Sequence, residues 1–158
     1  MGLLSQTKPG ANSRHLLNNR FGLDLPADWD DQSVYRFQGP MEDGTLHHVT
    51  VTIEHGVDAQ DVAAFARRQI KALENEMQGY HELKSGPIEL ADHRPAYDLV
   101  FKWCPIPDRE IYQRMVWTLG EKSAYLLTAS FSKKTWKLWA DRVDRIIRSF
   151  TVASEKAT

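Results

Sequence analysis

Six histidines and one cysteine are the side chains in this sequence best suited to bind a metal ion or to act as a nucleophile. They are His15, His47, His48, His55, His81, His93 and Cys104. Metal sites usually draw ligand pairs from spacings such as His-x-x-x-His or Cys-x-x-Cys, and no such pair occurs in the chain. His47 and His48 are adjacent on a predicted strand, where neighbouring side chains point to opposite faces. We therefore expect no metal site.

The same residues give little support for catalysis. Cys104 precedes Pro105 at the end of a predicted strand, and a catalytic thiol needs a base and an electropositive setting that its sequence neighbours do not identify. Carboxylate and histidine neighbours such as Asp92 and His93 are common without acid–base function. No two glycines are close enough to form a phosphate-binding loop. We expect neither a catalytic residue nor a bound cofactor.

Length and composition predict one domain. The chain has 158 residues, of which 42% are hydrophobic, enough to bury a core without metals or disulfides. We place this domain at residues 15–153, between a flexible leader at 1–14 and a flexible polar tail at 154–158. The 20 basic and 21 acidic residues are interspersed. The sequence therefore shows no basic patch of the kind that binds nucleic acid or an anionic membrane.

The chain shows no sign of membrane insertion or export. Its N-terminus lacks the apolar centre of a secretory signal, and no run approaches the ~20 apolar residues that span a bilayer. The single cysteine excludes an internal disulfide, which suits a reducing compartment. We expect a soluble cytoplasmic protein.

Residues 96–131 are predicted to form three consecutive strands around which the rest of the chain packs. Apolar residues recur there at every second position, and Gly120 marks a tight turn before the third strand. In the first strand Tyr97 and Leu99 share an apolar face, whereas Asp98 points to the other. The third strand carries little charge on either face, so we place it inside the sheet.

Four further strands are predicted at residues 21–25, 33–37, 46–54 and 80–90. Pro26 ends the first of them, and the last is interrupted at residues 85–87. Two segments instead show the period of an amphipathic helix. The first covers residues 58–77, with Gly79 placed to cap it. The second follows Ser132, a predicted N-cap, and carries a stripe of Trp136, Trp139, Ala140, Val143, Ile146, Ile147 and Phe150.

These elements predict an α+β fold, in which a largely antiparallel β-sheet carries two main α-helices. One apolar face would suffice to hold both helices. Four aliphatic residues nevertheless lie off the main core face by strand parity: Val34, Val100, Val116 and Leu126. We interpret part of this surplus as an apolar groove for a partner.

Four segments, in their order along the chain, resemble the DcrB/PsbP-like superfamily. They are FGLDLPADWDDQSVYRF, AAFARRQIKALENEMQGY, ADHRPAYDLVFKW and RVDRIIRSF. The opening segment is more similar to the Eag-type chaperones of bacterial type VI secretion effectors, which belong to that superfamily. The resemblance spans residues 15–152 and rests on the order of the segments, since none of them is a catalytic motif.

The resemblance implies a PsbP-like or DcrB-like fold and a cytoplasmic homodimer. It further implies that the protein binds the apolar N-terminal transmembrane helices of a secreted effector, of the PAAR or Rhs type, and aids its loading on the secretion spike. An apolar helix of ~20 residues would aggregate in the cytosol, and a concave apolar sheet face can cover it. In such chaperones, aliphatic strand residues and a few glutamines hold the helix.

Carried over by position, the resemblance implies that Val34, Val51, Gln69 and Gln113 bind the client helix. A shift of one residue would put Arg114 in place of Gln113.

Two positions leave this set of residues open. The chain has Arg36 where the resemblance implies an aliphatic residue. Alternation also allows either of two sets in the third strand to face the groove: Val49, Val51 and Ile53, or Thr50 and Thr52.

Two other functions remain as hypotheses. One is a DcrB-like or PsbP-like accessory protein that binds a different protein partner without catalysis. The other is an enzyme, which would require a pocket with convergent polar groups.

Overall fold

The computed structural model describes residues 12–17, 21–42 and 44–153. Contacts divide the chain into two units, one ending at Asp31 and the other beginning at Gln32, a division that falls inside the domain expected over 15–153. The first unit contains an antiparallel hairpin of β1 (Asn12–Leu17) and β2 (Phe21–Pro26). The strand predicted to end at Pro26 is therefore confirmed.

The predicted flexible ends fall mostly outside the described residues. Residues 1–11 of the leader and the whole tail at 154–158 are not described. Residues 12–14, at the end of the expected leader, belong to β1.

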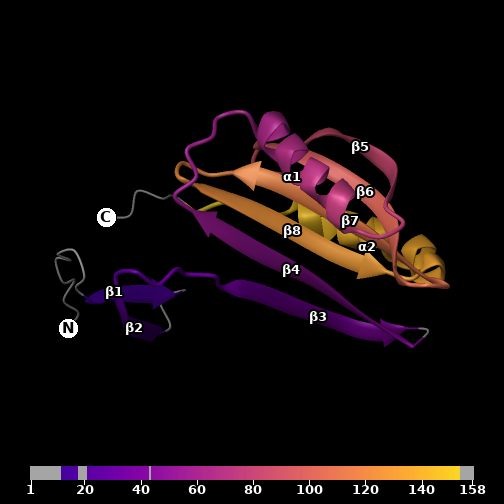
Figure 1. The fold of residues 1–158 in the computed structure, drawn as a ribbon, viewed down its shortest axis with the longest axis horizontal. Helices are drawn as coiled ribbons and strands as arrows, with labels where there is room; N and C mark the ends of the chain where they lie inside the picture. The colour runs from indigo at the N-terminus through magenta and orange to yellow at the C-terminus, as the bar shows by residue number, and fades with distance from the viewer. Residues whose placement is uncertain (1–11, 18–20, 43, 154–158) are drawn as a thin grey trace. The chain divides into compact units, whose positions relative to one another are not determined.

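The second unit is built on a six-stranded antiparallel sheet with two helices (Figure 1). In spatial order the strands are β3 (Val34–Glu42), β4 (Thr45–His55), β8 (Ser123–Phe131), β7 (Arg109–Leu119), β6 (Pro95–Ile106) and β5 (His81–Glu89). The predicted α+β fold is confirmed. β6, β7 and β8 are the three strands predicted within residues 96–131, and β8 lies between β4 and β7, inside the sheet as its lack of charge indicated.

The two helices pack on opposite faces of the sheet (Figure 1). They are α1 (Val62–Glu76) and α2 (Lys133–Arg148). α1 contacts β6 and β7, whereas α2 contacts β7 and β8. Two adjacent residues of β7 show the division, because Val116 packs in the apolar cluster of α2 and Trp117 in that of α1.

This arrangement corrects the expectation that one apolar face holds both helices. A sheet covered on both sides needs apolar residues on both faces. Val100 and Val116 are accordingly buried, at 4% and 0% exposure, and Leu126 packs against the α1 cluster. Of the four surplus aliphatics, Val34 alone stays exposed, at 56%.

Capping interactions fix where the helices begin. The Ser132 hydroxyl accepts from the Thr135 N–H at 3.1 Å, and Thr135 Oγ1 accepts from the Ser132 N–H at 2.9 Å, so the predicted N-cap of α2 is confirmed. α1 begins later than predicted because the Asp61 carboxylate caps it, accepting from the Ala63 N–H at 3.0 Å.

β5 differs from its predicted form. The strand is continuous through the predicted interruption at residues 85–87. Pro87 is tolerated because β5 is an edge strand, where a missing N–H costs no ladder hydrogen bond. The irregularity in its pairing with β6 falls earlier, between Glu82 and Lys84.

Candidate functional site

The side chains best suited to chemistry do not converge. Within the described part of the chain, no three His, Cys, Asp or Glu side chains are grouped closely enough to hold a metal ion. Among the described residues there is also no helix with the length and apolar character needed to cross a membrane. The surfaces of the sheet are the better candidates for a site.

Small polar residues cover the α1 side of the sheet on strands β4 and β8. With their neighbours on β3 and β7 they form what we call the α1-side face, made of Val34, Thr50, Thr52, Gln113, Thr128 and Ser130. Strand register brings them together, because directly paired residues of antiparallel strands point to the same side. Val34 pairs with Thr52, and Thr50 with Thr128. α1 contacts β6 and β7, so it flanks this face.

Gln113 lies in the α1-side face and is not fully hydrogen-bonded. Its Nε2 donates to Ser130 Oγ at 3.0 Å, whereas its Oε1 is buried without a partner among the described residues. An unpaired buried acceptor is costly, and a donor from a bound molecule would relieve this cost. Arg114, the alternative at this position, points to the other face, where it pairs with Asp98.

Gln69 lies on the flank of α1 that faces the α1-side face. It is exposed, one turn after the buried Phe65. Two residues apart on a helix lie ~200° apart around the axis, so Arg67 is on the opposite flank. That flank faces the β5 edge of the sheet, since Arg67 lies 5.6 Å from the Tyr97 ring and lines a hollow with Glu82.

Val51 is the one implied residue that lies on the other face. It packs against the buried cluster under α2. Of the two alternatives left open for this strand, Thr50 and Thr52 share the face of Val34, whereas Val49, Val51 and Ile53 point to the α2 side. The structure thus brings Val34, Gln69 and Gln113 to one side of the sheet and leaves Val51 apart.

Arg36 lies on the same side of the sheet as Val34. The α1 side of β3 therefore carries an arginine where the resemblance implies an aliphatic residue. The Arg36 guanidinium is 3.5 Å from His48 Nε2. Burial lowers the pKa of His48, and the charges of Arg36 and His47 lower it further. A neutral imidazole next to the guanidinium avoids repulsion between two cations.

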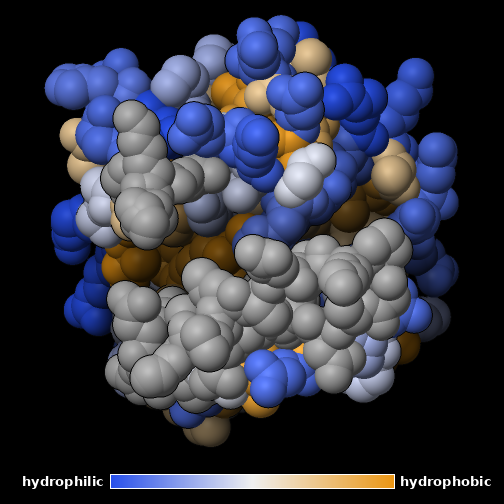
Figure 2. Space-filling model, turned by 90° about the vertical axis from the view of Figure 1, so that its left-hand side faces the viewer, coloured by the Kyte–Doolittle hydropathy of each residue, from blue (hydrophilic) through white to orange (hydrophobic). Residues whose placement is uncertain are grey.

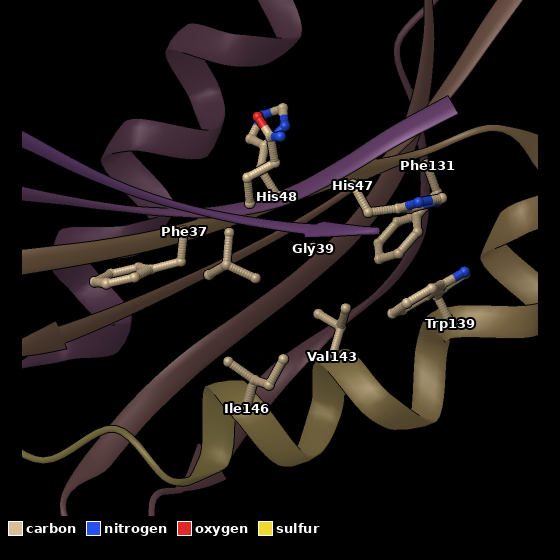
Figure 3. Close-up of a pocket in the computed structure, with 10 residues that line it drawn as sticks. Phe37, Gly39, His47, His48, Phe131, Trp139, Val143 and Ile146 are labelled. Carbon is tan, nitrogen blue, oxygen red and sulfur yellow. The ribbon is translucent and has the colours of Figure 1, made fainter. Parts of the chain in front are cut away.

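A second candidate surface, which the sequence did not reveal, lies on the other side of the sheet (Figure 3). This α2-side groove lies between α2 and the β3–β4 pair, encloses about 200 Å³ and has an almost entirely apolar lining. Its principal lining residues are Phe37, His47, Val49, Trp139, Val143 and Ile146. The His47 ring stacks on Trp139 with centroids 4.9 Å apart, and its Nδ1 lies 3.4 Å from the Pro40 carbonyl oxygen.

Exposed apolar residues mark this groove. Phe37 and Ile146 are 63% and 51% exposed on opposite sides of it. On the face of the molecule drawn in Figure 2, hydrophobic residues lie between hydrophilic ones. The predicted apolar stripe of the second helix contained Ile146, and its width was the signal that could have indicated an uncovered flank.

Comparison with known proteins identifies the family. The sequence model of the DcrB family matches residues 22–149, which is most of the chain. The chain belongs to the DcrB family. No match was found among curated proteins.

Solved structures show the fold of this DcrB-family protein. PA94 of Pseudomonas aeruginosa, a protein of unknown function, is similar with a TM-score of 0.74 at 16% identity, over 92% of this chain and 99% of PA94. The PsbP protein CyanoP of Synechocystis sp. PCC 6803 is similar with a TM-score of 0.50 at 9% identity, over 97% of this chain and 99% of CyanoP. The predicted DcrB-like and PsbP-like fold is confirmed, and membership in the DcrB family indicates an accessory protein.

Proposed function

We propose that this DcrB-family protein is a cytoplasmic chaperone or adaptor for a type VI secretion effector of the PAAR or Rhs type. It binds the apolar N-terminal transmembrane helices of the effector, shields them from water and aids loading on the secretion spike. The proposal rests on the resemblance to Eag-type chaperones. The observation that carries it is that Val34, Gln69 and Gln113 lie on one side of the sheet.

The α1-side face is mostly polar and not the apolar groove expected from the sequence, but its small side chains suit close packing of a helix. Its threonine and serine side chains are short and uncharged, so a helix backbone can approach the sheet closely. Arg36 and Glu54 lie on the same side of the sheet at its margins, and the six residues that define the face are uncharged. Gln113 is partly exposed in this face, and a side-chain amide can hydrogen-bond with a serine or threonine hydroxyl of the helix as helices do with one another in membranes.

The rest of the proposal concerns assembly. A homodimer would present two such faces and could hold two client helices at once. We propose no catalytic activity, no nucleic-acid partner and no insertion of the chaperone itself in a membrane. An accessory role toward a different protein partner is the alternative within the same family.

Co-expression with the N-terminal region of a PAAR or Rhs effector tests the proposal. We expect a soluble complex of the two proteins, and an effector that is mostly insoluble when expressed alone. The double variant Gln69→Ala, Gln113→Ala should lose most of the complex while it keeps its own fold, measured by circular dichroism. The matched control is Gln60→Ala, Gln78→Ala, which removes two exposed glutamines that lie outside α1 and the strands.

Two outcomes would overturn the proposal. One is that the wild-type chain forms no complex with effector N-terminal regions and does not raise their soluble fraction. The other is that the complex forms but both double variants retain it equally. The first outcome would leave the alternative accessory role.

A further inference from the structure

The α2-side groove is a surface that the proposed client site does not use. It lies on the opposite face of the sheet from Gln113 and is built entirely within the second unit (Figure 3). Val143 and Ile146 of α2 face Phe37 of β3 across it. Since Phe37 and Ile146 are more than half exposed, neither element covers the apolar area of the other.

Positive charge borders this groove along α2. The Arg142 guanidinium lies 4.7 Å from the centroid of the Trp139 ring, which lines the groove. Arg145 follows by three residues and therefore lies on the same side of the helix, next to Ile146. Among the described residues, neither guanidinium forms an ion pair.

Negative charge is absent from the lining of the groove. None of the residues that line it is acidic. One acidic residue contacts the lining: the Glu42 carboxylate accepts from Trp139 Nε1 at 2.9 Å and is thereby engaged. The imbalance of charge favours an anionic occupant over a cationic one.

We propose that the α2-side groove binds an acidic peptide segment of a partner protein, with one large apolar side chain in the groove and neighbouring carboxylates on Arg142 and Arg145. A single buried anchor with charged neighbours is a common form of peptide recognition. The volume of about 200 Å³ suits one side chain. It is below the ~300 Å³ at which small-molecule sites usually begin, and a whole helix would not fit.

A labelled peptide tests this inference directly. The probe is a fluorescein-labelled peptide with one tryptophan between two pairs of aspartates, and its binding to the full chain is followed by fluorescence anisotropy. Two control peptides carry alanine for the tryptophan or lysine for the aspartates. We expect the wild-type chain to bind the probe at least roughly tenfold more tightly than either control, because both the anchor and the charges contribute.

Variants of α2 then locate the binding surface. Arg142→Glu, Arg145→Glu should weaken probe binding roughly tenfold and should improve binding of the lysine peptide. The matched control Lys133→Glu, Lys137→Glu reverses two exposed charges on the other flank of α2 and should leave probe binding unchanged. Ile146→Asp, at an exposed position, should weaken binding without loss of the fold.

Several results would overturn the inference. Equal affinity for the three peptides would exclude a site that recognises both anchor and charge. Equal loss in the two charge-reversal variants would place binding outside the groove. If the probe did not bind the wild-type chain and Ile146→Asp weakened self-association in sedimentation, the occupant would be a second copy of the chain. By contrast, we expect that the Gln69→Ala, Gln113→Ala variant loses client helices and still binds the probe, because the two surfaces are separate.

Discussion

Arg114 and Asp98 form a two-point ion pair beneath α2. Arg114 Nε lies 2.9 Å from Asp98 Oδ1, and Nη2 lies 3.3 Å from Oδ2. Nη1 reaches Asp144 on α2 at 2.7 Å, so the pair ties the helix to the sheet. Burial lowers the pKa of Arg114, but its hydrogen bonds to Asp98 and Asp144 outweigh burial and raise the pKa above its ordinary value. The guanidinium therefore stays charged inside the protein.

Removal of Arg114 should destabilise the fold strongly. Arg114→Met leaves the Asp98 carboxylate, 2% exposed, without its cation, and loss of one partner of a buried pair typically costs ~3–5 kcal/mol. Urea unfolding measures the change. Arg148→Met removes a cation that is 44% exposed and should cost less than ~1 kcal/mol.

A double variant distinguishes the cost of leaving Asp98 unpaired from the cost of losing the Arg114 side chain itself. Arg114→Met combined with Asp98→Leu should regain most of the stability, since apolar residues often replace a buried ion pair without net cost. If Arg114→Met and Arg148→Met cost the same, the buried pair does not anchor α2.

Asp144 should make the stability of the protein depend on acid pH. Burial raises the pKa of Asp144, but hydrogen bonds and charges from Arg114 and Arg148 outweigh burial and lower it below its ordinary value of 3.8. The folded protein thus holds this carboxylate charged more firmly than the unfolded chain. The stability it contributes is complete above the unfolded pKa and is lost as the pH falls through the folded pKa.

The measurement compares urea unfolding between neutral pH and pH values below 3.8, the ordinary pKa. The wild-type protein should lose stability more steeply in the acid range than Asp144→Asn. Asp141→Asn, at an exposed position of α2, is the control and should follow the wild type. Parallel pH profiles for wild type and Asp144→Asn would contradict the prediction.

The capping box at the start of α2 should contribute measurably to stability. Ser132→Ala removes the hydroxyl that accepts from the Thr135 N–H and should cost ~1 kcal/mol in the free energy of unfolding. Ser132→Asp keeps an acceptor at the N-cap and should unfold close to the wild type. Similar destabilisation by both substitutions would mean that packing, not capping, fixes this end of the helix.

Local patterns sufficed to predict the elements of the second unit, although not β1, because alternation and helical period depend on residues close in sequence. The strands β6, β7 and β8 and the Ser132 cap were predicted in this way. Patterns could not assign the helices to faces, since both faces of a central strand such as β7 carry apolar residues. Val116 therefore looked like surplus when it was part of the core under α2.

Contacts between strands could not be predicted from the sequence, for a different reason. Asp98 looked like the polar side of a half-buried strand, because its partner Arg114 lies on the next strand and only the register places them together. The third-strand ambiguity had the same origin. It is settled by the pairing of Val34 with Thr52, which puts the threonines of β4 on the α1 side.

The face proposed for the client helix can be tested with one substitution on each side of the β3–β4 pair. Thr50→Glu puts a charge in the middle of the α1-side face, where an apolar helix would have to desolvate it. We expect most of the co-expressed effector segment to become insoluble. Phe37→Glu changes a residue that is 63% exposed on the other face and should leave the complex intact.

Both variants should fold, since Thr50 is partly and Phe37 largely exposed, and thermal unfolding of each chain alone checks this. Phe37→Glu should also weaken binding of the acidic peptide probe to the chain, because Phe37 lines the α2-side groove. The opposite pattern, with the effector segment released by Phe37→Glu and retained by Thr50→Glu, would move the client helix to the α2 side. Val51, and not Thr50, would then be the residue of β4 nearest to the client.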